Sequence, residues 1–594
     1  MRFIATIVSL FIAAALLILG ISFKFFSGPK EVSISIPSDS SVSYVVIDPQ
    51  VLHIHSGAQY LKVAGADVNT VAYGQTNDVL SWLGGSSYSH VSVDAKSKKV
   101  STQVVSAVTS GENVPTATAA QDQSIVSPAG SDMWIGEATA EKDQAILSLD
   151  IKSNQSVIVA SSGKAPAPSD ITVSWPLPQP TFLWMNDDVL MIVGGFFLLF
   201  GIGIYLWALW HMRRGQGPRR RGRMPKPPRP PRSIGRSTRR ISGPSKGRRA
   251  ISGSRSMVAL ALSGLVIVGV SACSTGVAAT PTPSPTSTSD ENPDAPKPVV
   301  TEQQLAVILG KVTTTLNESD QKLDSGLVAT RLAGAALEVR LANYAIRKSN
   351  KKIAALPSLK PSPVQLFLPQ TTALWPRSIL AMVETVDPSK KDKQAPTVAV
   401  VMTQESPRSN YKVVYTINLE ANQKIPEVAA ATVGTPLVAH DTKLLAVSPQ
   451  DLAKVYADVV NKKDKSKYAS LFSSTSDSFR TTIAAERKAQ ATSKDVKVTF
   501  ADYPGTDAIA FAAQNAGAIV AVQMNEKATF TPLNNRDLKL TGALKALAGL
   551  EISNRPIQAT YSMQLFFYVP PVGSTHHIEM LGYTENPTFV KLLG

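Results

Sequence analysis

An apolar run of 22 residues at positions 189–210 restricts this chain more than any other feature of its sequence. Two aspartates precede the run, and the arginine-rich stretch HMRRGQGPRRRGR follows it. A helix of this length can cross the roughly 30 Å hydrocarbon core of a bilayer. Arginine and lysine favour the cytoplasmic side of a membrane, so the charge asymmetry predicts a crossing from outside to inside. Two buried helices of a soluble protein would not explain that asymmetry.

A second uncharged run, at positions 3–23, follows Arg2 near the amino terminus. It is also long enough to span a bilayer, and it predicts a signal anchor over residues 1–27, with cleavage behind it left open. The run at 189–210 then corresponds to a transmembrane helix over residues 187–211. Residues 28–186 lie between the two helices and are expected outside the cytoplasm.

Residues 212–256 form a basic segment that is rich in proline and glycine. Between Arg213 and Arg255 there are fourteen arginines, two lysines and no acidic residue, so this stretch accounts for the whole net charge of +16. Such a composition cannot bury a core and predicts a disordered cytoplasmic segment. Its expected partner is the membrane, with anionic lipid headgroups bound through residues 213–255. Nucleic acid is disfavoured, because no aromatic side chains interleave to stack on bases.

The single cysteine, Cys273, follows a third apolar run at positions 257–272, which spans only about 24 Å as a helix. Val270, Ser271 and Ala272 precede it. This pattern resembles the lipobox of a bacterial lipoprotein signal, and the resemblance implies lipidation of Cys273. Because 256 residues stand before the run, residues 257–273 are expected to be either a signal cut before Cys273 or a third transmembrane helix. Both alternatives place everything after Cys273 outside.

Residues 274–299 are a Thr/Pro/Ser-rich stretch that predicts an extended linker. In residues 28–186, short alternating runs such as VSISI, SYVVI and SVIVAS are separated by turn residues, which predicts an all-β antiparallel sandwich or barrel. His53, His55 and His90 fall in this region, but no acidic partner accompanies them in the sequence. We therefore expect ordinary exposed or half-buried histidines and no metal site. A lone cysteine also excludes an intramolecular disulfide.

The C-terminal half contains two segments, VTEQQLA at 300 and VSPQDLA at 447, that align with an offset of 147 residues. Each places Ser or Thr before an apolar stripe of helical spacing, which predicts a capped helix at Thr301 and at Ser448. Strand-like runs follow in both copies, so two α+β domains are expected, over residues 300–446 and 447–594. This element order resembles tandem nuclear-transport-factor-two-like or cystatin-like domains.

Catalytic motifs are weak throughout. Ser-x-x-Lys occurs at Ser161, Ser319 and Ser349 without a Lys-Thr-Gly partner, and Gly-x-Ser-x-Gly occurs only at 243–247 within the basic segment. His440, His576 and His577 have no nearby cysteine or recognisable serine partner. Neither a catalytic residue nor a cofactor is expected.

The expected fold class is thus a multi-domain, membrane-anchored chain. It has an N-terminal all-β extracytoplasmic domain, two or three transmembrane helices and C-terminal tandem α+β domains. As a whole the chain resembles membrane-anchored lipoproteins of actinobacterial type. The expected function is a non-enzymatic cell-envelope protein that presents binding or scaffold domains, with an envelope protein or glycan as ligand. The alternatives are an envelope enzyme with a pocket in the C-terminal domains, or an accessory subunit of a transport or secretion complex.

Overall fold

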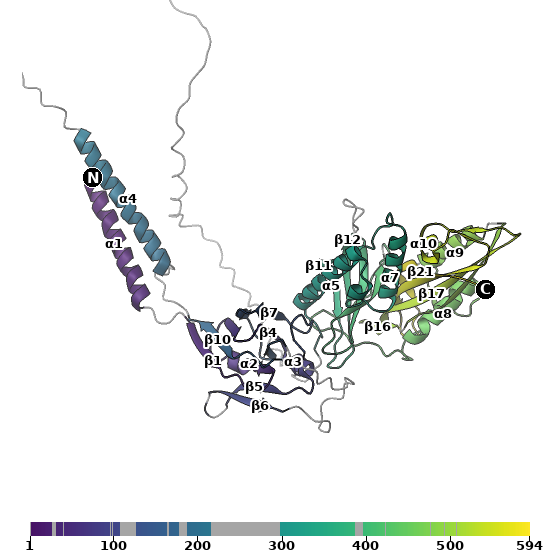
Figure 1. The fold of residues 1–594 in the computed structure, drawn as a ribbon, viewed down its shortest axis with the longest axis horizontal. Helices are drawn as coiled ribbons and strands as arrows, with labels where there is room; N and C mark the ends of the chain where they lie inside the picture. The colour runs from purple at the N-terminus through teal and green to yellow at the C-terminus, as the bar shows by residue number, and fades with distance from the viewer. Residues whose placement is uncertain are drawn as a thin grey trace, which may run out of the picture. The chain divides into compact units, whose positions relative to one another are not determined.

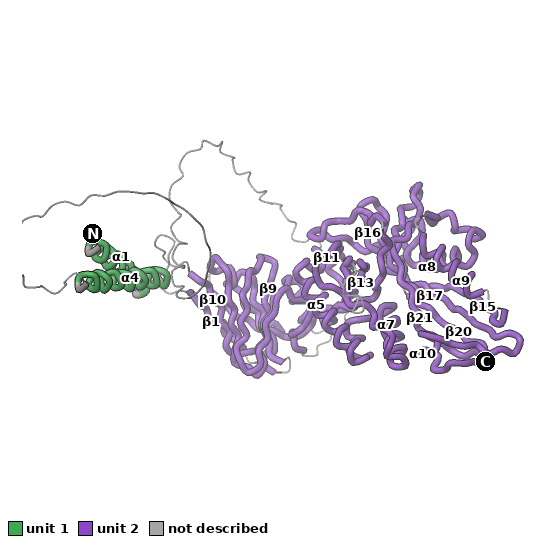
Figure 2. The backbone as a smooth tube through the Cα atoms, turned by 90° about the horizontal axis from the view of Figure 1, so that it is seen from above, with its two compact units in different colours: residues 1–26, 181–293 green, residues 27–180, 294–594 purple. Residues whose placement is uncertain are grey.

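The computed structural model describes residues 2–26, 31–106, 126–177, 187–214 and 297–594, with short gaps at 40, 95–96, 98, 163–164, 387–395, 422, 476, 492–493 and 507. The chain forms two compact units (Figure 2). Unit 1 comprises residues 1–26 and 181–293, and unit 2 comprises residues 27–180 and 294–594. The third apolar run lies outside the described residues, as do the basic segment beyond Arg214 and the linker up to residue 296.

Unit 1 contains two long helices, α1 (Arg2–Phe26) and α4 (Asp187–Arg214), which lie side by side (Figure 1). Leu17 meets Gly194 and Leu10 meets Gly201, so the helices run antiparallel. The glycines let the two backbones approach closely, and the Ser9 hydroxyl donates to the main-chain oxygen of Phe197 at 2.9 Å.

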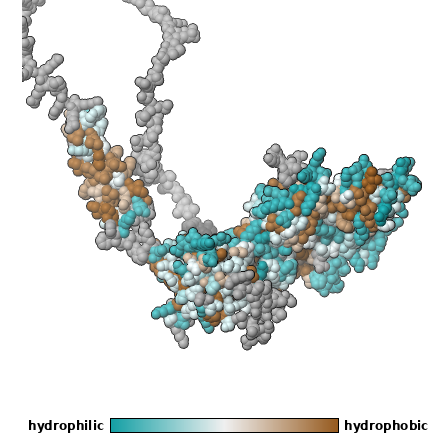
Figure 3. Space-filling model, in the orientation of Figure 1, coloured by the Kyte–Doolittle hydropathy of each residue, from teal (hydrophilic) through white to brown (hydrophobic). Residues whose placement is uncertain are grey.

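Both helices are long and apolar enough to cross a membrane, over Ile4–Ser22 and Asp188–Met212. Only 22% and 17% of these stretches are buried, whereas a core helix of a soluble protein would be mostly covered. Apolar side chains accordingly gather on the visible surface of the pair (Figure 3). The two helices predicted from the sequence are therefore present. As predicted, α4 begins at Asp187, and it continues three residues beyond 211, to Arg214.

Unit 2 begins with a part rich in strands, residues 31–177, called here the β part. It has a four-stranded sheet in the order β1-β10-β3-β8 and a six-stranded sheet in the order β6-β5-β2-β9-β4-β7. The strands are β1 (Glu31–Ile36), β2 (Tyr44–Ile47), β3 (Gln59–Ala64), β4 (Val68–Gln75), β5 (Tyr88–Val93), β6 (Val100–Val105), β7 (Gly136–Glu141), β8 (Ala145–Leu149), β9 (Gln155–Ala160) and β10 (Asp170–Pro176). Val157 and Val159 of β9 face the core between the sheets, while Ile158 and Ala160 face outward into a second cluster.

The alternating runs predict an all-β domain, but the β part also contains helices. Two helices, α2 (Pro49–Leu52) and α3 (Thr76–Leu83), interrupt the strands, and β2 pairs with β5 in parallel. Val79, Trp82 and Leu83 fall at helical spacing on one face of α3 and cover the outer face of the six-stranded sheet. The sequence TNDVLSWL contains this spacing, but a segment of two turns is too short for periodicity to distinguish a helix from a strand.

The rest of unit 2 has two halves, residues 297–446 and 447–594, each with helices followed by a sheet (Figure 1). The first half contains α5 (Glu302–Lys322), α6 (Ser325–Val328), α7 (Gly334–Ser349), β11 (Ser358–Pro369), β12 (Arg377–Val386), β13 (Thr397–Gln404) and β14 (Lys412–Asn418). The second half contains α8 (Pro449–Lys462), short 3-10 turns at Lys463–Lys465 and Ala469–Leu471, α9 (Ser478–Gln490), β15 (Val496–Pro504), β16 (Ile509–Ala512), β17 (Ala518–Pro532), β18 (Leu538–Lys539), α10 (Gly542–Ala548), β19 (Ile552–Ser553), β20 (Ile557–Val569) and β21 (Glu579–Leu592).

The two sheets of these halves, β11-β12-β13-β14 and β15-β17-β20-β21, pack against each other, and the long helices cover their outer faces. Alternation along the strands produces this layering. In β12, Ile379 and Ala381 face the helices of the first half, whereas Leu380 and Met382 face the other sheet. In each half helices precede the main sheet, as predicted, although α10 of the second half lies between β18 and β19. A common origin of the two halves stays a prediction.

Candidate functional site

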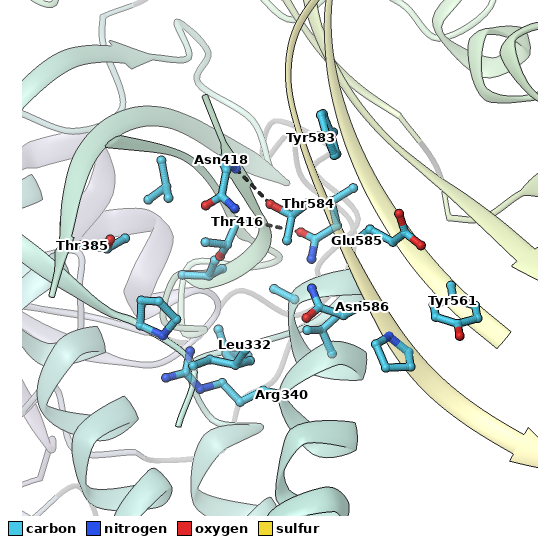
Figure 4. A pocket seen from close by; sticks show the side chains of 18 of the residues that line it. Leu332, Arg340, Thr385, Thr416, Asn418, Tyr561, Tyr583, Thr584, Glu585 and Asn586 are labelled. Carbon is cyan, nitrogen blue, oxygen red and sulfur yellow. Dashed lines mark hydrogen bonds between the residues drawn. The ribbon is translucent and has the colours of Figure 1, made fainter. Parts of the chain in front are cut away.

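A cavity of about 500 Å³ lies between the two C-terminal halves (Figure 4). Its wall on the side of the first half is mostly apolar. The residues that form this wall include Leu316, Leu332, Ala336, Val339, Leu356, Leu359, Val398 and Val413. The opposite wall comes from α9, β20 and β21, and includes Thr482, Glu486, Tyr561, Tyr583, Thr584, Glu585 and Asn586. The cavity therefore has an apolar side and a side that carries carboxylates.

The position of β21 explains why both walls belong to one cavity. This strand is at the edge of its sheet, and successive side chains on a strand point to opposite faces. Thr584 and Asn586 point toward the first half, whereas Tyr583 and Glu585 point to the other side (Figure 4). Tyr583 packs against Phe479 of α9, with 5.0 Å between ring centroids. The cavity consequently extends around the edge of the sheet.

Two hydrogen bonds join β14 to the second half at the cavity. The main-chain N–H of Thr416 donates to Gln564 Oε1 at 2.7 Å, and that of Asn418 donates to Thr584 Oγ1 at 2.9 Å (Figure 4). Side chains of the second half thus accept hydrogen bonds from the main-chain N–H groups of β14, the edge strand of the first sheet. This arrangement fixes the separation of the two walls.

Arg340 is the one basic residue that lines the cavity within the described residues, and its charge is already paired. Its Nε and Nη2 donate to the two carboxylate oxygens of Asp320 at 3.0 and 2.6 Å. The Tyr344 hydroxyl also donates to Asp320, at 2.7 Å. Burial, together with Asp320, raises the pKa of Tyr344 to about 12. These three side chains form a closed network, which supports the wall and leaves no free cation there.

Glu585 is the most unusual titratable group of the site. Its half-buried carboxylate has no hydrogen bond or ion pair among the described residues. Burial, and then the nearby carboxylates of Glu486 and Glu526, raise the pKa of Glu585 to about 7. The positive charge of Arg487 lowers the pKa of Glu585 only partly, because this guanidinium is already bound to two other carboxylates. Its Nη2 donates to both oxygens of Asp502 at 2.7 Å, and its Nε donates to Glu526 at 2.8 Å.

The predicted lipidation site, Cys273 with Val270, Ser271 and Ala272, lies outside the described residues, as does the 243–247 motif. The three histidines of the β part have separate surroundings. His90 Nε2 lies 2.8 Å from Asp48, His53 contacts the main chain of its own helix, and His55 packs against Trp175. Nowhere in the described part of the chain do three or more His, Cys, Asp or Glu side chains form a group that could hold a metal ion.

The Ser-x-x-Lys motifs are dispersed. Ser161 and Ser319 are buried, Ser349 is exposed at the end of α7, and Ser319 donates to the main chain of its own helix. His576 and His577 lie in the connection between β20 and β21, as a turn would require, and His440 precedes α8.

Sequence reasoning missed the residues of the cavity. Glu585 lies in β21, whose sequence EMLGYTENPTFVKL contains both glycine and proline and lacks regular alternation, so no strand was expected there. The only usable signal was a carboxylate that stands two residues after a tyrosine and two residues before a proline.

Comparison with known families gives one match. Residues 296–590 match a family model described as a domain of unknown function (DUF8094). Comparison with curated proteins gives no match. The matched region begins where the first C-terminal half begins and ends within β21, so it contains both halves and the whole cavity between them, and it leaves out the β part and both apolar helices.

Proposed function

We propose that this chain is a non-enzymatic, membrane-anchored protein of the cell envelope whose C-terminal halves bind a small amphipathic ligand. In this proposal α1 and α4 cross the cytoplasmic membrane, residues 28–186 and 274–594 are extracytoplasmic, and residues 212–256 are cytoplasmic. The length, apolarity and exposure of the two helices support the anchoring. The arginines after α4 support the orientation.

The cavity between the halves carries the binding proposal. Its volume of about 500 Å³ is within the range of small-molecule sites, which are mostly apolar with a few polar groups. The apolar wall would accept a hydrocarbon or ring portion. Glu585 and Glu486 at the other side would accept a cation or a hydrogen-bond donor, and binding a cation would return the pKa of Glu585 toward its ordinary value.

A pair of fluorescent probes tests whether the cavity binds an amphipathic cation. Dansylcadaverine joins an apolar ring system to a primary amine, and N-butyl dansylamide lacks the amine. We expect the amine to bind more tightly than the neutral probe, by about tenfold, at pH 8, where Glu585 is ionised. Equal affinity for the two probes at pH 8, or no binding of either, would contradict the proposal.

Two neighbouring residues of α9 give a matched pair of variants. Thr482 lines the cavity, whereas the adjacent Thr481 is exposed and does not. Thr482→Trp should fill the cavity and abolish probe binding, and Thr481→Trp should leave it unchanged. Both variants add the same side chain to the same helix, so a difference between them reports on the cavity.

Glu585 also favours a second candidate, an enzyme that uses this carboxylate as general base. A carboxyl with a pKa near 7 inside a cavity is suited to proton transfer at neutral pH. Under this alternative, envelope extract incubated with the protein would yield a new product by mass spectrometry, and Glu585→Gln would abolish that product while the neutral probe still binds. Binding without any turnover supports the non-enzymatic function.

A further inference from the structure

The β part and the first C-terminal half contact each other through a buried, charged surface, although 199 to 326 residues separate the contacting positions in sequence. Arg331 of the first half lies against Asp132 of the β part, and both side chains are almost fully buried. Asp132 also accepts from the main-chain N–H of Tyr411 at 2.9 Å, and its own N–H donates to Asn410 Oδ1 at 3.0 Å. This aspartate is therefore satisfied entirely by the first half.

A second buried ion pair joins Asp78 of α3 to Arg377 of β12. Arg377 Nη2 donates to Asp78 Oδ1 at 2.8 Å, with both side chains more than nine-tenths buried. Trp375 stacks on the same guanidinium, 3.6 Å from its ring centroid. Burial raises the pKa of Asp78 in spite of Arg377, which shows how completely this carboxylate is removed from water.

Arg408 completes the contact at the C-terminal end of α3. Its Nε donates to the main-chain oxygen of Trp82 at 2.9 Å, and its Nη2 to that of Leu83 at 3.0 Å. Carbonyl groups in the last turn of a helix have no partner within the helix and carry partial negative charge. The Leu83 oxygen also accepts from Ser86 N–H at 3.1 Å, so Arg408 gives Leu83 a second donor and supplies the donor for Trp82.

Each side of this surface is incomplete without the other. The β part would present two buried aspartates and the Trp82 carbonyl at the end of α3, and the first half would present three arginines. Removing one member of such a buried pair costs far more than a surface ion pair contributes, because the remaining charge is left without water. The charges of this surface thus make it specific for its partner.

We infer that the β part is the membrane receptor for the C-terminal halves of this same chain: the Asp78 and Asp132 surface keeps them at the membrane even when the chain between residues 214 and 294 is cut. Together with the proposed membrane anchoring, this docking constrains the topology of the chain. A chain that enters through α1 and leaves through α4 reaches the side opposite the β part. The C-terminal halves dock on the β part, so the chain returns across the membrane between residues 215 and 293, where 257–272 is the one long apolar run.

The test uses the full-length chain in membranes, with a site for a specific protease replacing residues 281–287 and a tag behind Gly594. This site lies after Cys273, so a cut leaves every apolar helix and any lipid on the membrane side. We expect more than nine-tenths of the tagged C-terminal piece to sediment with the membranes after cleavage. Its release would overturn the inference. Uncut protein in the soluble fraction would instead contradict the membrane anchoring itself.

A charge exchange distinguishes docking from non-specific retention. Arg377→Asp should release the cut piece, because it places two carboxylates together and raises the dissociation constant by about 100-fold or more. Asp78→Arg combined with Arg377→Asp should restore retention. Lys360→Asp, which changes the charge of a half-exposed pair within the first half by the same amount, should have no effect. Retention of Arg377→Asp equal to that of the unaltered chain would also overturn the inference.

Discussion

Gly582 of β21 and Asn418 of β14 approach each other so closely that a Cβ atom at position 582 would overlap the main-chain oxygen of Asn418. A bulge in β21 makes this approach, because Phe566 pairs with Gly582 while Phe567 pairs with Met580, which leaves Leu581 as the extra residue. The main-chain oxygen of Leu581 then accepts from Glu420 N–H at 3.0 Å. The two C-terminal halves are thus joined where glycine alone fits.

Gly582→Ala should lower the free energy of unfolding of unit 2 by about 1–3 kcal/mol, because the backbones must separate to admit the methyl group. Gly310→Ala serves as the control. Gly310 lies in α5 with open space around its Cβ position, so alanine there should stabilise the helix by about 0.5–1 kcal/mol. Urea unfolding of both variants measures the contrast. An unchanged midpoint for Gly582→Ala would contradict the close approach.

Glu585→Gln should stabilise the protein at pH 8 and have no effect near pH 4.5. The pKa of Glu585 is raised in the fold from 4.5 to about 7, so the folded state disfavours its charged form. Stability is therefore lost as pH rises between these values, and the cost is fully present above pH 7. Because the side chain is half exposed, the gain in the variant is on the order of 1 kcal/mol.

Urea midpoints at pH 4.5 and pH 8 check this prediction. The exposed Glu405→Gln is the control and should change neither midpoint. Equal midpoints for Glu585→Gln and the unaltered chain at pH 8 would show that Glu585 is ionised in the fold without cost.

Local signals in the sequence predicted the elements of unit 2 better than its contacts. The helix at Thr301 begins with a full capping box: Gln304 N–H donates to the Thr301 hydroxyl at 3.3 Å and Gln304 Oε1 accepts from Thr301 N–H at 3.0 Å. At Ser448 the helix also begins as predicted, but the hydroxyl donates to Asp451 rather than accepting from the main chain. Caps and alternation involve residues a few positions apart, so they can be read from sequence.

The cavity and the charged surface involve residues far apart, and no local pattern marks them. Asp132 lies between β6 and β7, outside any helix or strand, and its partner Arg331 lies 199 residues away. The pKa of Glu585 is raised by burial in the fold, and then by Glu486 on a helix and Glu526 on another strand. Neither residue differs from an ordinary surface acid until the fold places it.

Cysteine labelling tests the topology in a Cys273→Ser background. Because the β part and the C-terminal halves form one compact unit, exposed reporters at Glu141 and Lys465 should react from the same side of the membrane. A reporter at Ser237, within the basic segment, should react only after the membrane is permeabilised. Labelling of Glu141 and Lys465 from opposite sides would contradict the docked arrangement, and labelling of Ser237 from outside would contradict the orientation.

Cys273→Ala tests lipidation, which the sequence implies through the small residues before the cysteine and the short apolar run. Two acyl chains would anchor the C-terminal piece stably, since each buried methylene contributes about 0.8 kcal/mol. We expect a labelled fatty acid to enter a C-terminal piece of the unaltered chain, whereas Cys273→Ala should remain one full-length polypeptide without label. Identical migration of the two, with no label in either, would identify residues 257–273 as a third transmembrane helix. In the proposed topology the chain returns across the membrane under both outcomes, so this experiment decides only how it returns and leaves the topology test independent.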